Sequence, residues 1–152
     1  GKKVRYEPIS SVITSMQGGG LNLDTMQAGG LCGMATPLDP SFTTSDNLSG
    51  QVLAKEGQLP EIRDTISIQV NLMENMVTSD GDGPEPVMPL RNNEMLMVNV
   101  ATSTSVGVVS KSQSGKANLN LRLPICADSG QRVSISRRVG SRWRLIGYGT
   151  IE

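Results

Sequence analysis

Strict alternation of polar and apolar residues is the feature of this sequence that most constrains its fold. Residues 65–72, with the sequence TISIQVNL, alternate at every step, and residues 117–123, ANLNLRL, follow the same pattern. A period of two places all apolar side chains on one face of an extended chain, which is typical of a half-buried β-strand. Shorter segments of the same kind lie at 9–16, 51–54, 95–100, 106–110, 132–136 and 142–151.

Turn-forming clusters separate these segments and indicate the fold class. Glycine gathers with polar residues at 18–20, 80–84 and 114–116, where it allows the backbone conformations that tight turns need. No apolar stripe of helical period runs for more than two turns. We therefore predict an all-β fold, an antiparallel barrel or sandwich, in which closure of a barrel would hide the strand edges.

A stretch rich in Pro, Ser, Thr, Asp and Asn, from 39 to 50, predicts a boundary between two regions. Residues 51–152 hold enough strands for a complete domain, whereas residues 1–50 offer about three, too few to bury a core. We expect residues 1–50 to be an incomplete part of a larger barrel, with strand edges that can pair with a second copy of the chain. The acidic stretch 78–86 is expected to be an exposed loop.

The composition excludes most familiar catalytic arrangements. The chain has no histidine, which is the commonest general base and a common metal ligand. The glycines at 18–20 are not followed by Gly-Lys-Ser/Thr, so we expect a hairpin turn there and no phosphate-binding P-loop. Cys32 and Cys126 are not part of C-x-x-C pairs, so we expect no zinc site. Two free thiols in a reducing cytosol are favoured over a disulfide between them, which would need a secretory route.

One short segment resembles an enzyme motif. Residues 127–130, ADSG, imitate the Asp-Ser/Thr-Gly turn of aspartic proteases, which need two carboxylates that share one proton. The sequence favours a type I turn, in which Asp128 and Ser129 make local hydrogen bonds and Gly130 opens the backbone before the next strand. An aspartic-protease-like enzyme that uses Asp128 is the more distant alternative.

No targeting or membrane segment is visible. The longest apolar runs are a handful of residues, far below the ~20 of a membrane-spanning helix. The N-terminus carries no charged-then-apolar leader of the kind that directs secretion. We expect a cytoplasmic location and no membrane partner.

The net charge of zero hides an uneven distribution. Residues 56–94 contain eight acidic residues against Arg63 and Arg91, a net charge of −6, whereas residues 111–144 contain eight basic residues against Asp128, a net charge of +7. Such asymmetry favours either an anionic partner such as nucleic acid or compensation between the two halves within one barrel, and the spacing slightly favours compensation.

Arginine and aromatic residues interleave in the C-terminal run. Alternation places Arg142 and Arg144 on one face of a strand and Trp143 on the other, so we expect the indole to plug the barrel while the guanidinium groups reach solvent or acids. Gly147 and Gly149 are expected to allow a bulge or a close approach between strands.

This C-terminal run carries a specific resemblance. Residues 136–138 and 142–149, SRR and RWRLIGYG, resemble the C-terminus of the gamma subunit of archaeal and eukaryotic translation initiation factor two, a family related to elongation factor Tu. Further matches to that family follow in the same order and extend the resemblance over essentially the whole chain, at 6–9, 29–40, 46–53, 93–100 and 124–127.

The resemblance implies a domain organisation. Residues 1–50 are similar to the C-terminal strands of the family's second barrel, domain II, and residues 51–152 to the third domain, also an antiparallel β-barrel. In such a factor GTP and Mg²⁺ are held by a nucleotide-binding domain that would lie upstream of Gly1. The resemblance therefore implies that this chain has no cofactor, metal or catalytic residue of its own and is not an enzyme, although the intact factor would be a GTPase.

The resemblance also implies partners. The family delivers initiator methionyl-tRNA to the small ribosomal subunit in a GTP-dependent way. The expected partners are therefore that tRNA, the alpha and beta subunits of the factor, the small ribosomal subunit, the factor's own nucleotide domain and, in eukaryotes, an assembly chaperone. The alternative that the residues leave open is a free-standing β-barrel module that binds a protein and has no RNA role.

Two groups of site residues follow from the resemblance. The first is a wall of the pocket for the 3′ end of the tRNA, where missing side chains let a backbone approach the terminal adenosine; it comprises Gly29, Gly30, Leu31, Cys32 and Gly33. These glycines could equally serve only to close a barrel. The second group contacts either RNA or the rest of the factor and comprises Arg137, Arg138, Arg142 and Arg144. The sequence departs from the family pattern at Cys32 and in the loop 80–83.

Overall fold

The computed structural model describes residues 6–27, 29–76 and 83–152. These residues form two compact units, one built from Glu7–Ser49 and the other from Tyr6 together with residues 50–152. Within the described ranges, no helix has the length and apolar character needed to cross a bilayer.

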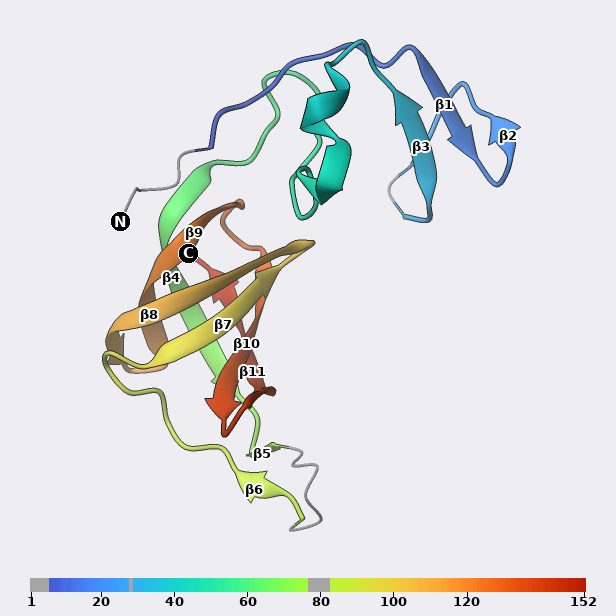
Figure 1. The fold of residues 1–152 in the computed structure, drawn as a ribbon. Helices are drawn as coiled ribbons and strands as arrows, with labels where there is room; N and C mark the ends of the chain where they lie inside the picture. The colour runs from blue at the N-terminus through green and yellow to red at the C-terminus, as the bar shows by residue number, and fades with distance from the viewer. Residues whose placement is uncertain (1–5, 28, 77–82) are drawn as a thin grey trace. The chain divides into compact units, whose positions relative to one another are not determined.

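Six antiparallel strands of the larger unit close into a barrel (Figure 1). In order around the barrel they are β10 (Arg132–Val139), β11 (Arg142–Ile151), β4 (Ile62–Leu72), β9 (Lys116–Cys126), β8 (Ser103–Gln113) and β7 (Met95–Val100). A short two-stranded sheet of β5 (Asn75–Met76) and β6 (Glu85–Pro86) belongs to the same unit. The prediction of an all-β fold is confirmed, and the architecture is a closed antiparallel barrel.

The alternating segments supply the barrel core. On β4, Ile66 and Ile68 are buried, while Thr65 and Gln69 are exposed. On β9, Ala117 and Leu119 are buried in the same way. Facing strands complete the apolar core, whose most deeply buried members include Leu96, Val98, Val109, Ile125, Val133, Ile135, Ile146 and Ile151. Burial of each such side chain contributes roughly 1.5–3 kcal/mol to folding, so this core is the main source of the barrel's stability.

A β-bulge interrupts the alternation on β11. Ile135 pairs with Gly147 and Ser136 pairs with Leu145, so Ile146 is an extra residue on β11. Ile146 and Gly147 are consecutive and both buried, which shows that the inward and outward positions exchange there. As a result, Trp143 pairs with the outward-facing Arg138 and is half-buried. The expectation that the indole plugs the barrel is wrong, because the bulge turns Trp143 to the outside.

Two glycines allow β11 to approach β4 closely. A Cβ atom added at Gly147 would lie 2.3 Å from the backbone oxygen of Asn71 and 2.9 Å from the Cα of Leu72. One added at Gly149 would lie 3.1 Å from the side chain of Ile68. The expected bulge and close strand approach are therefore both present at this end of the sequence.

The smaller unit contains a three-stranded antiparallel sheet in the order β2-β1-β3. The strands are β1 (Ser15–Gly18), β2 (Leu21–Asn22) and β3 (Cys32–Ala35). Two short 3₁₀ turns follow, Pro40–Phe42 and Thr44–Asp46. The first is capped by Asp39, whose pKa is lowered by hydrogen bonds from the hydroxyl and the backbone amide of Ser41. None of the described residues of this unit is buried, so the apolar core of the described chain belongs to the barrel.

Some local expectations differ from the structure. Residues 51–54 form no strand, and of residues 9–16 only Ser15 and Met16 belong to one. The expected hairpin turn at 18–20 joins β1 to β2, and that at 114–116 joins β8 to β9. The predicted turn at 80–84 and the loop 78–86 fall partly outside the described residues. Residues 83–86 are all exposed, as expected, but Glu85 and Pro86 form the short strand β6.

The turn at residues 128–131 is present but is not of type I. The Gln131 amide donates to the Asp128 carbonyl at 3.4 Å, which closes the turn. Gly130, its third residue, has a φ of 85°, the conformation that distinguishes a type II turn from type I. The Ser129 hydroxyl accepts a hydrogen bond from Arg63 Nη2 at 3.2 Å, so this turn helps to fix the end of the barrel.

Candidate functional site

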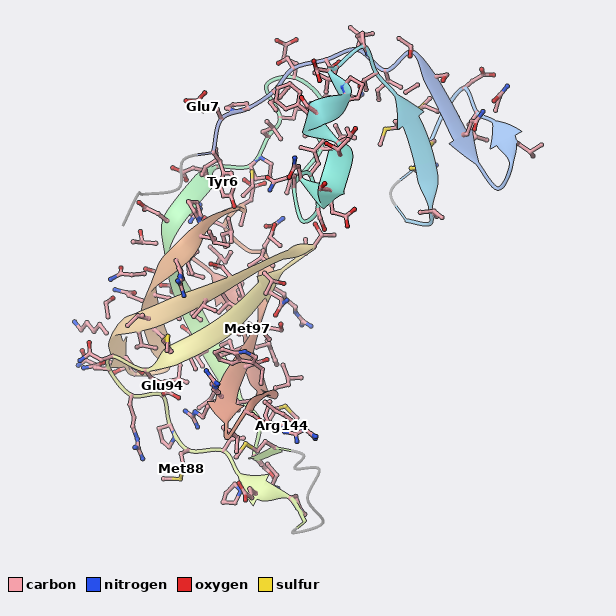
Figure 2. All side chains as sticks on the ribbon, viewed as in Figure 1. Tyr6, Glu7, Met88, Glu94, Met97 and Arg144 are labelled. Carbon is pink, nitrogen blue, oxygen red and sulfur yellow. The ribbon has the colours of Figure 1, made fainter. Side chains whose placement is uncertain are left out.

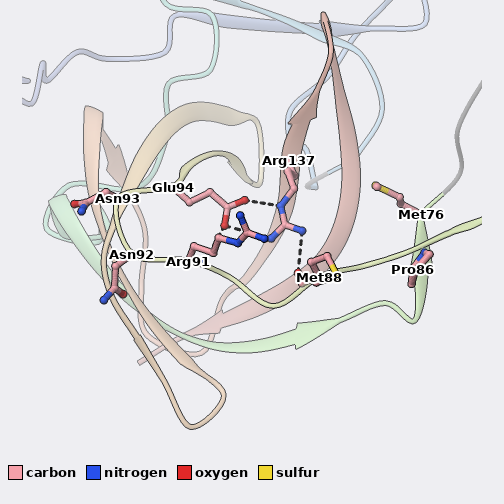
Figure 3. A pocket seen from close by; sticks show the side chains of 8 residues that line it. All are labelled: Met76, Pro86, Met88, Arg91, Asn92, Asn93, Glu94 and Arg137. Atoms are coloured by element: carbon pink, nitrogen blue, oxygen red, sulfur yellow. Dashed lines mark hydrogen bonds and ion pairs between the residues drawn. The ribbon is translucent and has the colours of Figure 1, made fainter.

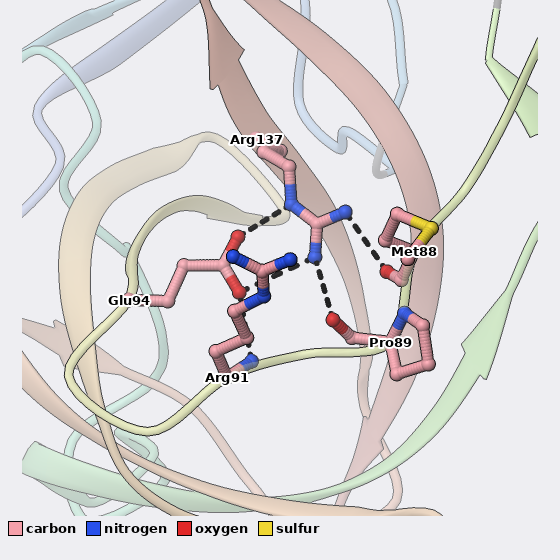
Figure 4. A network of polar contacts seen from close by, with 5 residues as sticks. All are labelled: Met88, Pro89, Arg91, Glu94 and Arg137. Carbon is pink, nitrogen blue, oxygen red and sulfur yellow. Dashed lines mark hydrogen bonds and ion pairs between the residues drawn. The ribbon is translucent and has the colours of Figure 1, made fainter.

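Arg137 forms the best-defined polar cluster in the barrel (Figure 4). Its guanidinium pairs with the carboxylate of Glu94, through Nε to Oε1 and through Nη2 to Oε2 at 3.2 Å. Nη1 also donates to the Met88 carbonyl at 2.8 Å, and Nη2 to the Pro89 carbonyl at 3.2 Å. This fork ties the segment before β7 to β10.

Local geometry explains why these two charges meet. Arg137 pairs with Leu96 across the β10–β7 ladder, and Leu96 faces the barrel interior. Arg137 therefore points toward the end of the barrel, where Glu94 precedes β7. The side chains are only 15% and 16% exposed, and the Glu94 carboxylate also accepts the Arg91 amide at 2.9 Å. For Arg137, the structure thus shows compensation between the acidic and basic halves, as the spacing favoured.

A cavity of about 420 Å³ lies beside this cluster (Figure 3). Arg137 and Glu94 form one part of its lining, and the apolar side chains of Met76, Met88 and Pro86 form another. Arg91, Asn92 and Asn93 complete it. The backbone amide of Ser112, on β8, donates a hydrogen bond to Asn92 Oδ1 at 2.9 Å. This bond fixes the segment at Asn92 and Asn93 to β8.

The other three arginines lie around the turn between β10 and β11. Arg138 is exposed, and its Nε donates to the Gly140 carbonyl at 3.3 Å. Arg142 is exposed and pairs across the ladder with Val139. Arg144 is half-buried and pairs with Arg137; Figure 2 shows it at the lower end of the barrel, away from Met97 on β7. The structure thus separates Arg137, which is held in the cluster with Glu94, from a more exposed group at the turn.

The glycine-rich segment of the smaller unit is open. Gly29 and Gly30 have φ values of 108° and 81°, in the region that glycine tolerates, and no atom lies within 4 Å of a Cβ added at either. Leu31 is 96% exposed, and Cys32 and Gly33 lie on β3 opposite Gly18 and Gln17. The segment therefore presents bare backbone and exposed side chains, and its role as a pocket wall stays a prediction.

Both cysteines are free, as expected. Cys32 is exposed, whereas Cys126 is half-buried at the end of β9. The Cys126 thiol donates to the Pro60 carbonyl at 2.9 Å. Burial, and to a lesser extent the negative charge of Asp128, raises the pKa of Cys126.

Sequence reasoning missed several residues that the fold brings into prominence. Glu94, the partner of Arg137, is an acidic residue directly before the strand predicted at 95–100. That position at a strand end was the feature from which a role for Glu94 could have been predicted. The contact of Tyr148 could not be predicted, because its partner lies on another strand. The guanidinium of Arg132, on β10, lies 5.1 Å from the centre of the Tyr148 ring.

Comparison with known proteins gives one consistent result. A family model described as "Initiation factor eIF2 gamma, C terminal" matches residues 64–151, which include most of the barrel. The chain is 47% identical over 152 residues to the translation initiation factor 2 subunit gamma of Methanococcus aeolicus. It is 46% identical over 152 residues to the protein of the same name from Methanocaldococcus jannaschii, and 43% identical over 150 residues to that of Thermococcus kodakarensis.

These matches cover nearly all of this chain but only about a third of each relative. They cover 99–100% of this chain, and the chain spans 36–37% of the length of these relatives. The resemblance seen in residues 136–149 is confirmed, because the family match spans more than half of the chain and ends at Ile151. The barrel of β4 and β7–β11 thus corresponds to the C-terminal region that this family model describes, and the chain belongs to the initiation factor eIF2 gamma family.

Proposed function

We propose that this chain serves as the C-terminal portion of a gamma subunit that carries initiator methionyl-tRNA to the small ribosomal subunit in a GTP-dependent way. The observation that carries the proposal is the family match over residues 64–151, together with 47% identity over the whole chain to a named gamma subunit. In this role residues 1–50 supply the C-terminal strands of domain II and residues 51–152 form domain III. The site of action is the cytoplasm.

The chain's own part is that of a binding scaffold. The open backbone of Gly29 to Gly33 supports its assignment as a wall for the tRNA 3′ end, since no side chain stands in front of Gly29 or Gly30. The exposed Arg138 and Arg142 suit contact with RNA or with the rest of the factor. The alpha and beta subunits, the factor's own nucleotide domain and, in eukaryotes, an assembly chaperone are the expected protein partners.

The glycine cluster at 18–20 does not fit a GTP site. A P-loop joins a strand to a helix and ends in Lys-Ser/Thr. Here Gly18, Gly19 and Gly20 instead join β1 to β2, with φ values of 58° and 79° at Gly19 and Gly20. We therefore assign GTP and Mg²⁺ to the nucleotide domain of the intact factor and no catalytic step to this chain.

A chimera tests the proposal. The segment of the Methanococcus aeolicus gamma subunit that aligns with this chain is replaced by residues 1–152, and binding of initiator methionyl-tRNA is measured with a GTP analogue present. We expect affinity within about tenfold of the parent, equivalent to ~1.4 kcal/mol, because the two segments share 47% identity. A folded chimera that binds GTP but not this tRNA would contradict the proposal.

A further inference from the structure

The outer surface of the β10–β11 hairpin carries large side chains that the core does not use. Cross-strand pairing places Tyr148 beside Ser134 and Trp143 beside Arg138. Leu145 lies between the two aromatic residues along β11. Tyr148 is 44% and Leu145 is 51% exposed, and Trp143 is half-buried.

The bulge at Ile146 brings these side chains to one face. If the same sequence alternated regularly, with no bulge, Trp143 and Leu145 would share the inward face with Gly147 and Gly149, and Tyr148 would stand alone outside. With it, all three project from the same surface of β11. A bulge that re-aims side chains in this way is a feature that sheets use to build binding surfaces.

Two arginines give this face a positive charge. Arg132 and Arg138 lie at outward positions of β10, and neither β10 nor β11 contains aspartate or glutamate. Arg137 is paired with Glu94, but no carboxylate of the described residues forms an ion pair with Arg132 or Arg138. The flanking outward positions are uncharged: Met97 and Asn99 on β7, and Gln69 and Asn71 on β4.

Arginines interleaved with exposed aromatic rings match the chemistry of unpaired nucleic acid. A single strand offers phosphates to guanidinium groups and free base faces to aromatic rings, whereas a duplex keeps its base faces inside the stack. Tyr148 lies opposite Ser134, and Trp143 lies opposite Arg138, four residues further along β10. That interval is about 13 Å at ~3.3 Å per strand residue, the length of about four nucleotides at ~3.4 Å each.

We propose that this outer face of the β10–β11 hairpin, centred on Arg132, Arg138, Trp143 and Tyr148, binds single-stranded RNA. The bases stack on Tyr148 and Trp143, and the arginines hold the phosphates. The inference goes beyond the tRNA-carrying role, which assigns the acceptor end to residues 29–33, and it does not depend on that role.

The chain contains its own probe for this interaction. Trp143 is its one tryptophan, so tryptophan fluorescence reports on this face. The 152-residue chain is titrated with labelled oligoadenylate of about ten nucleotides, a length that covers the expected footprint. We expect quenching of Trp143 fluorescence together with a rise in oligonucleotide anisotropy, and weaker binding at higher salt.

Matched variants separate stacking from charge. Tyr148→Ala is expected to weaken binding about 5- to 100-fold, the range for loss of one base stack, and Tyr148→Phe to leave it near the parent value. Arg138→Gln is expected to weaken binding, whereas Arg122→Gln removes an exposed charge of β9 outside this face and leaves binding nearly unchanged. Thermal unfolding of each variant verifies that the barrel is intact.

Three outcomes would overturn the inference. The first is equal affinity for the single strand and for an RNA duplex of the same charge, and the second is equal loss in Arg138→Gln and Arg122→Gln. The third is quenching of Trp143 by an acidic polyglutamate peptide but not by RNA, which would make this face a protein-docking surface. The tRNA-binding chimera reports on the proposed function separately, because it depends on initiator methionyl-tRNA and a GTP analogue.

Discussion

At the scale of single residues, Arg137 shows how one side chain can join distant parts of the chain. Its hydrogen bonds reach Glu94, Met88 and Pro89, all more than 40 positions earlier. Because both charges are largely removed from water, neither is stable without the other. The cluster therefore holds the segment before β7 in place, and with it one side of the cavity lined by Met76 and Met88.

We predict that Glu94→Gln and Arg137→Met each lower the free energy of unfolding by about 1–3 kcal/mol, because each leaves hydrogen-bonding groups of the partner unsatisfied. The double variant should lose less than the sum of the two, with a coupling of at least ~1 kcal/mol. Urea denaturation of the four proteins measures this cycle. Additive losses would mean that the two side chains act independently.

Cysteine reactivity is predicted to differ strongly between the two thiols. The thiolate is the reactive form, and burial together with Asp128 raises the pKa of Cys126. Iodoacetamide at mildly alkaline pH should therefore modify the exposed Cys32 first, and Cys126 should accelerate only as the pH rises above the ordinary thiol pKa. Mass spectrometry of digested protein follows both sites. In the Cys32→Ser variant, only the slow modification of Cys126 should remain. Equal rates of modification at Cys32 and Cys126 in the parent chain would contradict this prediction.

At the scale of elements, close contact between β11 and β4 depends on one missing side chain. We predict that Gly147→Ala costs about 2–4 kcal/mol, because its Cβ would lie 2.3 Å from the Asn71 oxygen and the two strands must move apart. Gly140→Ala is the matched control: its φ is 59°, but no atom lies within 4 Å of the added Cβ. That variant should cost about 1 kcal/mol, from backbone strain alone. Equal melting temperatures for the two variants would contradict this.

The smaller sheet presents an edge. β3 has β1 on one side and, within the described residues, no strand on the other. An open edge of this kind tends to pair with another chain. Light scattering over a range of concentrations should show self-association of the 152-residue chain; a strict monomer at high concentration would contradict this prediction.

Elements with regular alternation were predictable, and those shaped by contacts distant in sequence were not. The expected strands at 95–100 and 142–151 coincide with β7 and β11, and the segment 65–72 lies within β4. Residues 51–54 alternate as well, yet they join no ladder within the described part of the chain. The prediction that Trp143 points into the barrel failed for another reason. A bulge is a mismatch between two paired strands, so the residue pattern of one strand does not reveal it.

At the scale of the whole chain, the two units differ in how they are stabilised. The larger unit contains all the buried apolar residues found in the described ranges, whereas the described residues of 7–49 include none. Local opening is easiest where few apolar groups are buried. The chain should therefore open in parts of very different stability.

Hydrogen exchange followed by mass spectrometry should show this difference. Amides of β4, β9 and β11 should exchange slowly, near the rate set by global unfolding, and amides of residues 7–49 should exchange much faster. Ile68→Ala, which removes part of the core, should cost about 2–5 kcal/mol and speed exchange in the barrel without changing residues 7–49. Equal protection in the two units would show that they unfold together.

The bulge at Ile146 also fixes a reading frame for β11, in which the position of a residue relative to the bulge decides whether its side chain points inward or outward. After the bulge, the odd-numbered residues of β11 point into the barrel; before it, the even-numbered residues do. Inserting one residue between Leu145 and Ile146 would shift that frame, turning Trp143 and Leu145 into the barrel and Arg144 out of it, whereas deleting Ile146 would only remove the bulge. Single-residue insertions in this strand should therefore be tolerated far less than substitutions, and insertions in the alignment of its relatives should avoid residues 142–146.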